Sequence, residues 1–543
     1  MKITNPILRG FNPDPSIVRV GDEVFIATST FEWYPGVQIH RSRDLKNWAL
    51  AGRPLDRAAQ LDMRGNPDSG GVWAPCLTHS DGLFWLVYSD MKRRDGAFKD
   101  AKNYLVTAPS IEGPWSNPIY LNGSGFDASM FHDTDGRKWL VNMIWNHNRP
   151  GAEKFGGIVI QEYSVEEQCL VGEIRNIYRG TDLGLVEGPH LYRRDGWYYL
   201  LTAEGGTEFE HAVTMARSRD LFGPYETDPA KHVLTSKDTG PDHLLQRAGH
   251  ADIVEMADGS LFMVHLCSRP LPKTRDLPEG AAKRDVCRSP LGRETAIQRI
   301  VWPEGDFPHL AHGGVAPAAE IDGPDLSEVP VDQVPETRTF DAGLPPEFQW
   351  LRTPYPDRLF STDARPGHLR IFGRESMGSD FEHALVARRQ EDKAYAAECV
   401  LEAEPKHYQQ AAGLVTYYNR HKFYAAMVTH DAELGRVLVL MSCAGDWQTE
   451  QLTFPTAPVP LEDGPVALRV EVVGATQRFF LRRGEAWEPV GEALDASVIS
   501  DEGGRGEHAS FTGAFVGMAA YDLSGLAWAA RFTDFAYVPG EDP

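Results

Sequence analysis

"NGSGFDASMFHDTDGRKWL", residues 122–140, places a carboxylate at the start of a stretch that reads as a buried strand. Asp127 stands between Phe126 and Ala128, directly before the apolar run, and the segment HDTDG that follows has the composition of a tight turn. An aspartate is a poor choice there, because an unpaired carboxylate is costly to bury. The reason for Asp127 must therefore lie elsewhere in the chain.

The same pattern occurs five times between residues 13 and 265. Each copy has a short apolar strand, a turn with Asp and Gly, and an aromatic-rich strand, and Asp-Gly between alternating strands is a strong hairpin signal. The turn aspartates are 54 to 63 residues apart, which is enough for one four-stranded unit per repeat. The copies are PDPSIVRVGDEVFIATS (13–29), WAPCLTHSDGLFWLVYS (73–89), FDASMFHDTDGRKWLVN (126–142), EGPHLYRRDGWYYLLTA (187–203) and GHADIVEMADGSLFMVH (249–265).

Counting back eight residues from each turn aspartate reaches an equivalent position in every copy. Five such units that close radially make a five-bladed β-propeller, whose innermost strands line the central axis. Equivalent positions would then form a ring, and Asp127 would open onto a shared central pocket. The alternative, that each acidic residue caps only its own strand, does not account for three carboxylates at one repeat position. The ring would hold Asp14, Trp73, Asp127, Glu187 and His250.

The whole chain is predicted to be all-β, with two domains. The propeller would occupy residues 1–315, and residues 316–345, rich in Pro and acidic residues, read as a linker laid along the surface. Over residues 346–543, alternating runs such as YAAECVLEAE and VALRVEVVG predict an antiparallel β-sandwich.

The composition argues against several classes of protein. The formal net charge of −23 disfavours nucleic acid or an anionic membrane as a partner, since both require a basic patch. No apolar run approaches the about 18 residues of a membrane span. The N-terminus lacks the apolar core of a signal peptide, so a cytoplasmic location is expected. The cysteines, with no CxxC pair, then read as isolated buried thiols; they are Cys76, Cys169, Cys267, Cys287, Cys399 and Cys443.

The ring chemistry points to sugars. Two carboxylates that flank one bond, one protonated and one ionised, are the standard equipment of glycoside hydrolysis. Burial and like-charge neighbours separate their pKa values, and a third carboxylate can orient the acid. Aromatic faces stack on the apolar faces of sugar rings. Phe31, Trp73 and Trp145 are candidates for this contact, with core packing as the alternative for each.

Two short motifs are rejected as sites. PDSGGV (67–72) resembles the nucleophile segment of trypsin-like proteases, but Pro67 replaces the leading Gly and no matching His segment is present. HDTDG resembles part of a calcium loop without the spacing or the closing Glu of an EF-hand. His250 leaves open a divalent cation, such as calcium, or a water near the propeller axis. No cofactor is required by these residues.

Together these segments resemble glycoside hydrolase family 43, in particular its two-domain β-xylosidases, over essentially the whole chain. The segments that carry the resemblance are FNPDPS around Asp14, GGVWAP around Trp73, GFDASMFHD around Asp127, VEGPHL around Glu187, AGHAD around His250, LGRETAIQ around Arg293 and HASFTGAFVGM around Phe511.

The resemblance implies a role for each matching residue. Asp14 would be the general base that activates water, Glu187 the general acid, and Asp127 the group that orients Glu187 and raises its pKa. Inversion would place the Asp14 and Glu187 carboxyls about 6.5–9.5 Å apart. Phe511 would reach from the sandwich and help to close the pocket. The remaining residues would line the pocket for the terminal sugar: Phe31, Trp73, Trp145, His250 and Arg293.

The expected function is that of an inverting, exo-acting 1,4-β-xylosidase that releases D-xylose from the non-reducing ends of xylo-oligosaccharides. Activity on α-L-arabinofuranosides is an expected companion, because both pentoses lack the hydroxymethyl arm of a hexose. A mainly arabinofuranosidase activity is the first alternative, and a non-catalytic sugar-binding propeller is the second. The resemblance also implies a homo-oligomer, either a dimer or a tetramer.

Overall fold

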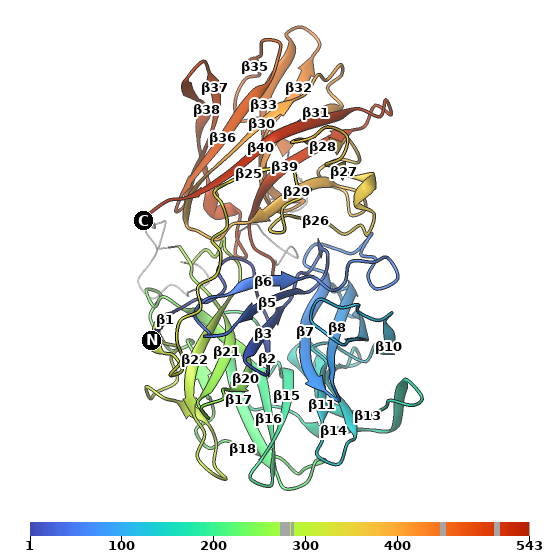
Figure 1. Cartoon of the computed structure of the whole chain (residues 1–543), viewed down its shortest axis with the longest axis vertical. Coiled ribbons are helices and arrows are strands. Elements are labelled where there is room, and N and C mark those ends of the chain that lie inside the picture. The colour runs from blue at the N-terminus through green and yellow to red at the C-terminus, as the bar shows by residue number, and fades with distance from the viewer. Residues whose placement is uncertain (272–282, 284–286, 446–451, 504–510, 542–543) are drawn as a thin grey trace.

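The computed structural model describes residues 1–271, 283, 287–445, 452–503 and 511–541. It shows two β domains stacked end to end, with the N-terminal domain below and the C-terminal domain above (Figure 1). Among the described residues, no helix is long and apolar enough to cross a membrane. The all-β prediction is confirmed, since the helices in these ranges are short 3₁₀ turns: η1 (Gly151–Lys154), η2 (Pro356–Arg358) and η3 (Ala496–Val498).

The N-terminal domain is the predicted five-bladed propeller, built from antiparallel sheets that follow one another along the chain. The first blade contains β2 (Ser16–Val20), β3 (Glu23–Thr28), β5 (Gln38–Ser42) and β6 (Ala49–Gly52). The second contains β7 (Gly71–Ser80), β8 (Leu83–Arg93), β9 (Asp100–Ala108) and β10 (Ile119–Asn122). The third contains β11 (Ser129–His132), β12 (Lys138–Trp145), β13 (Phe155–Ser164) and β14 (Cys169–Tyr178).

The last two blades continue the same order. The fourth contains β15 (Glu187–Arg194), β16 (Trp197–Glu204), β17 (Ala212–Ser218), β18 (Glu226–Thr227) and β19 (Leu234–Thr235). The fifth contains β20 (Gln246–Glu255), β21 (Leu261–Ser268), β22 (Glu294–Val301) and β23 (His309–Leu310). In each blade the predicted hairpin is the inner pair of strands, such as β11 with β12.

The Asp-Gly turns explain why these hairpins form. Asp81 and Gly82 both have positive φ, 55° and 75°, and Asp195 and Gly196 have 52° and 73°. A two-residue turn of this kind matches the right-handed twist of the flanking strands, and Asp and Gly tolerate the left-handed backbone that it needs. The local sequence therefore sets where these two blades fold back, while in the other three turns only the glycine has positive φ: Gly21, Gly136 and Gly259.

The N-terminal segment joins the last blade to the first. β1 (Lys2–Thr4) pairs with β24 (Glu320–Asp322), and the Leu8 N–H donates to the Thr295 carbonyl of β22 at 3.1 Å. β24 lies inside the segment predicted to be a linker. That segment therefore begins as a paired strand, because β1 offers it an edge.

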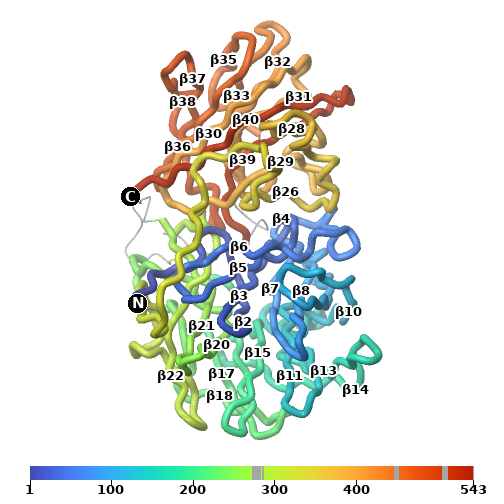
Figure 2. The backbone as a smooth tube through the Cα atoms, viewed as in Figure 1, coloured from blue at the N-terminus to red at the C-terminus, as the bar shows by residue number. Residues whose placement is uncertain are grey.

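The rest of the segment runs along the outside of the first blade toward the sandwich, as the yellow tube in Figure 2 shows. The Val329 N–H donates to Asp44 Oδ2 at 2.7 Å, and Lys46 pairs with Glu328 at 2.7 Å. Further on, β25 (Thr337–Thr339) pairs with the last strand of the sandwich. The acidic, Pro-rich stretch is thus held to both domains by surface contacts.

The C-terminal domain is the predicted antiparallel sandwich. One sheet contains β25, β27 (Phe360–Ser361), β28 (Leu369–Phe372), β30 (Ala394–Glu402), β36 (Val466–Val473), β37 (Thr476–Arg483), β38 (Ala486–Asp495) and β40 (Ala529–Pro539). The other contains β4 (Trp33–Tyr34), β26 (Gln349–Leu351), β29 (Ala384–Arg389), β31 (Gln410–Asn419), β32 (Lys422–Asp431), β33 (Gly435–Ala444), β34 (Leu452–Thr453), β35 (Val459–Pro460) and β39 (Phe515–Asp522).

One strand of this second sheet comes from the N-terminal domain. β4 follows the first inner hairpin of the propeller and pairs with β26, and the indole of Trp33 stacks on Phe515 with 3.7 Å between ring centroids. Both side chains are fully buried. Burying two large aromatic side chains against each other is worth several kcal/mol in a domain contact, about 1.5–3 kcal/mol for each. The sandwich is therefore firmly seated beside the residues that follow the first hairpin.

Candidate active site

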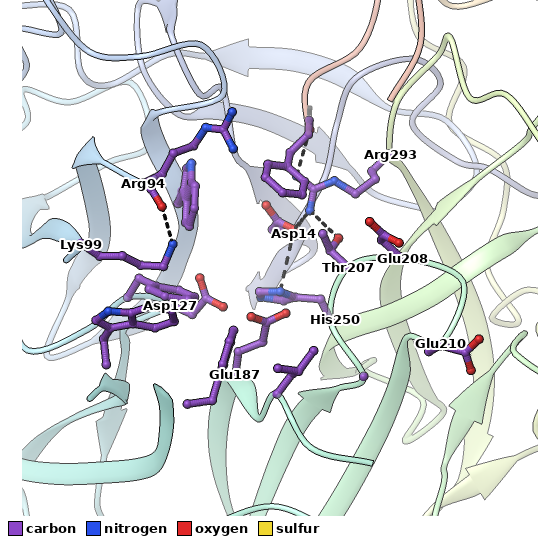
Figure 3. A pocket seen from close by; sticks show the side chains of 18 of the residues that line it. Asp14, Arg94, Lys99, Asp127, Glu187, Thr207, Glu208, Glu210, His250 and Arg293 are labelled. Carbon is purple, nitrogen blue, oxygen red and sulfur yellow. Dashed lines mark hydrogen bonds and ion pairs between the residues drawn. The ribbon is translucent and has the colours of Figure 1, made fainter. Parts of the chain in front are cut away.

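All the site residues predicted from the sequence line one pocket of about 580 Å³ (Figure 3). The pocket forms where the start of each innermost propeller strand faces a loop of the sandwich. Figure 3 shows Asp14, Arg293 and His250 together on one side, Asp127 with Lys99 on the other, and Glu187 between them. The predicted residues that it brings together are Asp14, Phe31, Trp73, Asp127, Trp145, Glu187, His250, Arg293 and Phe511.

A left-handed residue turns the backbone at each ring position or directly after it. Asp14, Asp127 and His250 themselves have positive φ, 54°, 54° and 46°. In the other two blades the next residue has it, Ala74 at 31° and Gly188 at 55°. Among residues with a side chain, Asp and His are enriched in this conformation. Asp127 thus precedes β11 rather than belonging to it, which explains a carboxylate at the head of an apolar strand.

Asp14 is held by one partner on each oxygen. Its Oδ1 accepts a hydrogen bond from Arg293 Nη1 at 2.9 Å, and its Oδ2 accepts one from the Ser29 hydroxyl at 2.7 Å. The side chain is only 6 % exposed. Charge-assisted bonds of this kind fix orientation as well as charge. The carboxylate is therefore rigidly aimed, with its free lone pairs available to a water in the pocket.

Glu187 is the carboxyl best placed to carry a proton. Burial, and then the negative charge of Asp14, raise its pKa to about 8, although Arg293 and Lys99 pull in the other direction. Within the described ranges, no side chain hydrogen-bonds its carboxyl group. A buried acid that is protonated near neutral pH and points into a pocket can give its proton to a bound substrate.

Asp127 lies beside Glu187 and is coupled to it. Burial, followed by the charges of Glu187 and Asp14, raises the Asp127 pKa well above its ordinary value. Mutual repulsion prevents both carboxyls from being ionised together. The Gly188 N–H donates to Asp127 Oδ2 at 3.2 Å, and this bond favours the ionised form of Asp127. Burial and this repulsion therefore favour a proton on the Glu187–Asp127 pair.

His250 is a neutral wall of the pocket. Burial lowers its pKa to about 4, and its Nδ1 lies 3.8 Å from Asp14 Oδ1. A Cβ added at Gly188 would lie 3.1 Å from the imidazole, and the φ of Gly188 is +55°. Both the left-handed backbone and the close approach of the His250 ring favour glycine at position 188.

Arg293 joins Asp14 to the sandwich. Besides Asp14, its guanidinium donates to Thr207 Oγ1 at 2.9 Å and to the Phe511 carbonyl at 3.0 Å. The neighbouring Gly292 allows this contact, because a Cβ there would fall 2.1 Å from the Thr512 carbonyl oxygen. One cation thus orients a carboxylate of the propeller and a backbone group of the other domain.

The aromatic residues form a continuous wall. The ring centroids of Phe31 and Trp73 are 5.8 Å apart, and those of Trp73 and Phe126 are 5.4 Å apart. Trp145 packs on Phe155 at 5.4 Å. Trp73 and Trp145 pack against the hydrophobic core and also line the pocket. Each therefore combines the two roles considered from the sequence, core packing and an apolar surface on which a ring could stack.

Several lining residues were missed from the sequence. Lys99 lies 4.6 Å over the Trp145 ring and donates to the Arg94 carbonyl at 2.7 Å; burial lowers its pKa to about 8. Thr207 and Glu208 come from the loop after β16. Lys99 and Thr207 lie in equivalent loops, between the second and third strands of their blades, but these loops differ in length and sequence, so repeat spacing gave no signal for them. The polar lining residues that were missed, called the polar mouth below, are Arg94, Lys99, Thr207, Glu208 and Glu210.

This geometry equips the pocket for acid–base chemistry on a small polar ligand. It holds one carboxylate anchored by a cation, one protonated carboxyl group and a third carboxylate coupled to the second. The aromatic wall supplies apolar faces for a ring-shaped ligand. Glycoside hydrolysis requires these parts together.

Comparison with known families agrees with this chemistry. A family model described as glycosyl hydrolases family 43 matches residues 3–308, and one described as the beta xylosidase C-terminal concanavalin A-like domain matches residues 337–538. The chain belongs to glycosyl hydrolase family 43. The two matched ranges coincide with the propeller and the sandwich of this family 43 glycoside hydrolase.

Named relatives of this family 43 chain are similar over its whole length. It is 52 % identical to a xylosidase/arabinosidase 43B of Humicola insolens, over 100 % of this chain and 98 % of that one. It is 49 % identical to a beta-xylosidase of Bacillus subtilis, over 99 % of each. Its fold matches the crystal structure of a xylan beta-1,4-xylosidase from Bacillus halodurans C-125 with a TM-score of 0.93 and 49 % identity, over 99 % of this chain and 100 % of that one.

Three expectations from the sequence stay predictions. In the described part of this family 43 enzyme, no group of three or more His, Cys, Asp or Glu side chains is arranged to hold a metal ion. The axial cation considered beside His250 stays a prediction. The homo-oligomer and the cytoplasmic location likewise stay predictions.

Proposed function

We propose that this glycoside hydrolase is an inverting, exo-acting 1,4-β-xylosidase that releases D-xylose from the non-reducing ends of xylo-oligosaccharides. The observation that carries the proposal is the pairing of an anchored Asp14 with a Glu187 whose pKa is raised to about 8, in one pocket with an aromatic wall. The similarity to a beta-xylosidase and to a xylan beta-1,4-xylosidase supports xylose as the sugar and a 1,4 linkage.

The sandwich supports exo cleavage. Phe511 lines the pocket, and its carbonyl is bound by Arg293, the residue that orients Asp14. A pocket that is blocked on one side admits the end of a chain but not its middle. The terminal sugar would sit among the three carboxylates, and the leaving sugar would extend toward the polar mouth around Lys99 and Glu208.

In the proposed mechanism, Asp14 takes a proton from a water on one face of the sugar while that water attacks the anomeric carbon. On the other face, Glu187 gives its proton to the glycosidic oxygen. The leaving sugar therefore departs as a neutral alcohol, and the attacking water loses its proton to Asp14. Asp127 keeps the proton on Glu187 until substrate arrives. The product would be α-xylose from a β-xyloside, with inversion at the anomeric carbon.

The first test is proton NMR of the enzyme acting on xylobiose, with the anomeric signals recorded before mutarotation. We expect the α anomer of xylose to appear first. Early β-xylose would mean retention, which would require one carboxylate to be a nucleophile and would overturn the assignment of Asp14 as base. No xylose at all would overturn the proposed substrate.

The acidic groups also predict the pH dependence. kcat/KM should be bell-shaped, and its basic side should fall as Glu187 loses its proton. Because the pKa of Glu187 is raised to about 8, the basic limb should lie near that pH.

Asp127→Asn should move that limb to lower pH. Removing a neighbouring negative charge makes the ionised form of Glu187 less unfavourable, so its pKa falls. We expect a shift of about one unit with a lower kcat, measured as kcat/KM against pH on an aryl xyloside. A basic limb that stays in place would contradict this role of Asp127.

A second candidate is a mainly α-L-arabinofuranosidase activity, favoured by the double name of one relative, a xylosidase/arabinosidase. The ratio of kcat/KM for aryl β-D-xyloside and aryl α-L-arabinofuranoside decides between them. We expect the xyloside to be preferred, with measurable turnover of the arabinofuranoside.

A further inference from the structure

The segment PDSGGV (67–72), which is no protease motif, lies at the junction between the two domains. Pro67 and Gly70 close a turn, with the Gly70 N–H donating to the Pro67 carbonyl at 2.9 Å. Between them, Ser69 is fully buried and has a φ of 55°. A buried serine in a left-handed conformation needs a strong local reason, because that backbone is costly for a residue with a side chain.

Ser69 uses every polar atom it has. Its N–H donates to Glu32 Oε2 at 3.1 Å, and its carbonyl accepts a hydrogen bond from the indole N–H of Trp73 at 2.9 Å. Its hydroxyl oxygen accepts from the Phe511 N–H at 3.1 Å and lies 2.9 Å from Thr512 Oγ1. One residue thus contacts two walls of the sugar pocket, the indole of Trp73 from the propeller and the backbone of Phe511 from the sandwich.

The turn that carries Ser69 is itself immobilised. Asp68 Oδ1 accepts from Arg352 Nη2 at 2.6 Å, and Asp68 Oδ2 lies 3.2 Å from Arg420 Nε. Both arginines belong to the sandwich, and Arg352 is fully buried. Breaking a buried ion pair leaves an uncompensated charge, so the turn resists displacement.

The partner segment from the sandwich is equally constrained. Thr512 is fully buried, and its carbonyl oxygen packs so closely on Gly292 that a Cβ there would lie 2.1 Å away. A Cβ at Gly513 would meet the Leu291 carbonyl at 2.8 Å. Neither side of the Ser69–Thr512 contact has room to shift, so the hydroxyl pair sets a fixed distance between the walls.

We propose that Ser69 is a positioning residue that holds Trp73 and Phe511 at the spacing that fits one pentose ring. The inference rests on the proposed function, because it concerns the same sugar pocket. Ser69 touches neither the acids nor the substrate. Ser69 acts on binding through Trp73 and Phe511. These two walls would contact the sugar equally in the ground state and in the transition state. Loss of such uniform binding raises KM and leaves kcat unchanged.

The experiment compares Ser69→Ala and Thr512→Val with wild type on an aryl β-D-xyloside, and measures D-xylose binding by calorimetry. Ser69→Ala removes the acceptor of the Phe511 N–H and the partner of Thr512 Oγ1, whereas Thr512→Val removes only the contact between the two hydroxyls. We expect KM and the D-xylose dissociation constant to rise about five- to thirtyfold, with kcat and both limbs of the pH profile unchanged. The double variant should lose no more than the worse single variant, because the two hydroxyls form one contact.

Two matched variants separate positioning from general damage. Thr512→Ser keeps the hydroxyl and should restore the wild-type KM. Ser42→Ala removes a buried hydroxyl that accepts the Asp44 and Leu45 N–H groups at 3.2 and 2.9 Å, at an outer turn of the first blade. It should lower the melting temperature and leave KM unchanged.

Three results would overturn the proposal. The first is an unchanged KM in both Ser69→Ala and Thr512→Val, and the second is a loss in these variants that is confined to kcat and accompanied by a shifted limb of the pH profile. The third is a Thr512→Ser variant with a KM as high as that of Thr512→Val. If Ser69→Ala does not fold, the Thr512 pair still decides. The proposed function fails separately, if the wild-type enzyme does not hydrolyse the xyloside.

Discussion

Glu187→Gln is expected to lower kcat on xylobiose by about 10²- to 10⁴-fold. The leaving group is a sugar hydroxyl, which departs slowly unless it receives a proton as the bond breaks. Burial and the charge of Asp14 raise the Glu187 pKa to about 8, so at neutral pH it is the group that holds this proton. The amide of Gln keeps the shape of the side chain but has no acidic proton to give.

The decisive measurement compares two substrates with the same variant. An aryl xyloside with a nitrophenolate leaving group needs little protonation, so its kcat should fall by no more than about tenfold. The D-xylose dissociation constant should stay near that of wild type, which shows that the pocket is intact. The basic limb of the pH profile on the aryl substrate should also disappear. Equal losses on both substrates would show that Glu187 is not the acid.

Asp14→Ala is the second large effect, and it should not depend on the leaving group. Water attacks the anomeric carbon with either substrate, and it is a poor nucleophile without a base. We expect kcat to fall by about 10³-fold or more on xylobiose and on the aryl xyloside alike. The substitution also removes the Asp14 carboxylate that accepts from Arg293 Nη1 at 2.9 Å, so KM should rise.

Azide tests this assignment further, because it is an anionic nucleophile that requires no base. In Asp14→Ala it should restore part of the turnover of the aryl xyloside and give α-xylosyl azide, with the configuration inverted. Asp133→Asn is a matched control. Asp133 is a buried residue of the third blade that accepts a hydrogen bond from the Tyr198 hydroxyl of β16 at 2.9 Å. It should keep near wild-type kcat. A β-xylosyl azide, or no rescue, would contradict the role of Asp14.

The repeat pattern carried most of the fold and the core of the site. An Asp-Gly turn and an aromatic strand can be read from local sequence, because the turn chemistry and the alternation of side chains are properties of neighbouring residues. Counting eight residues back from each turn then gave Asp14, Trp73, Asp127, Glu187 and His250, and the structure places all of them in one pocket. Arg293 and Phe511 were named only through the family resemblance.

Residues outside the repeat could not be found in this way. Lys99 and Thr207 enter the pocket from loops that differ between blades, so no equivalent position points to them. The segment predicted as a linker contributes β24 to one domain and β25 to the other, because each domain offers a free strand edge. Strand pairing across hundreds of residues leaves no local signal.

The sequence by itself thus determined five similar blades, a ring of three carboxylates at their centre and a separate β-rich domain. Only the tertiary structure decided how the two domains meet: β4 of the propeller entering a sheet of the sandwich, and Ser69 joining Trp73 to Phe511. It also decided that the pKa values of both Glu187 and Asp127 are raised. The physical reason is the same in each case, since spacing along a chain encodes contacts between neighbours, whereas burial, the repulsion between Glu187 and Asp127, and contacts between distant segments exist only once the chain is packed.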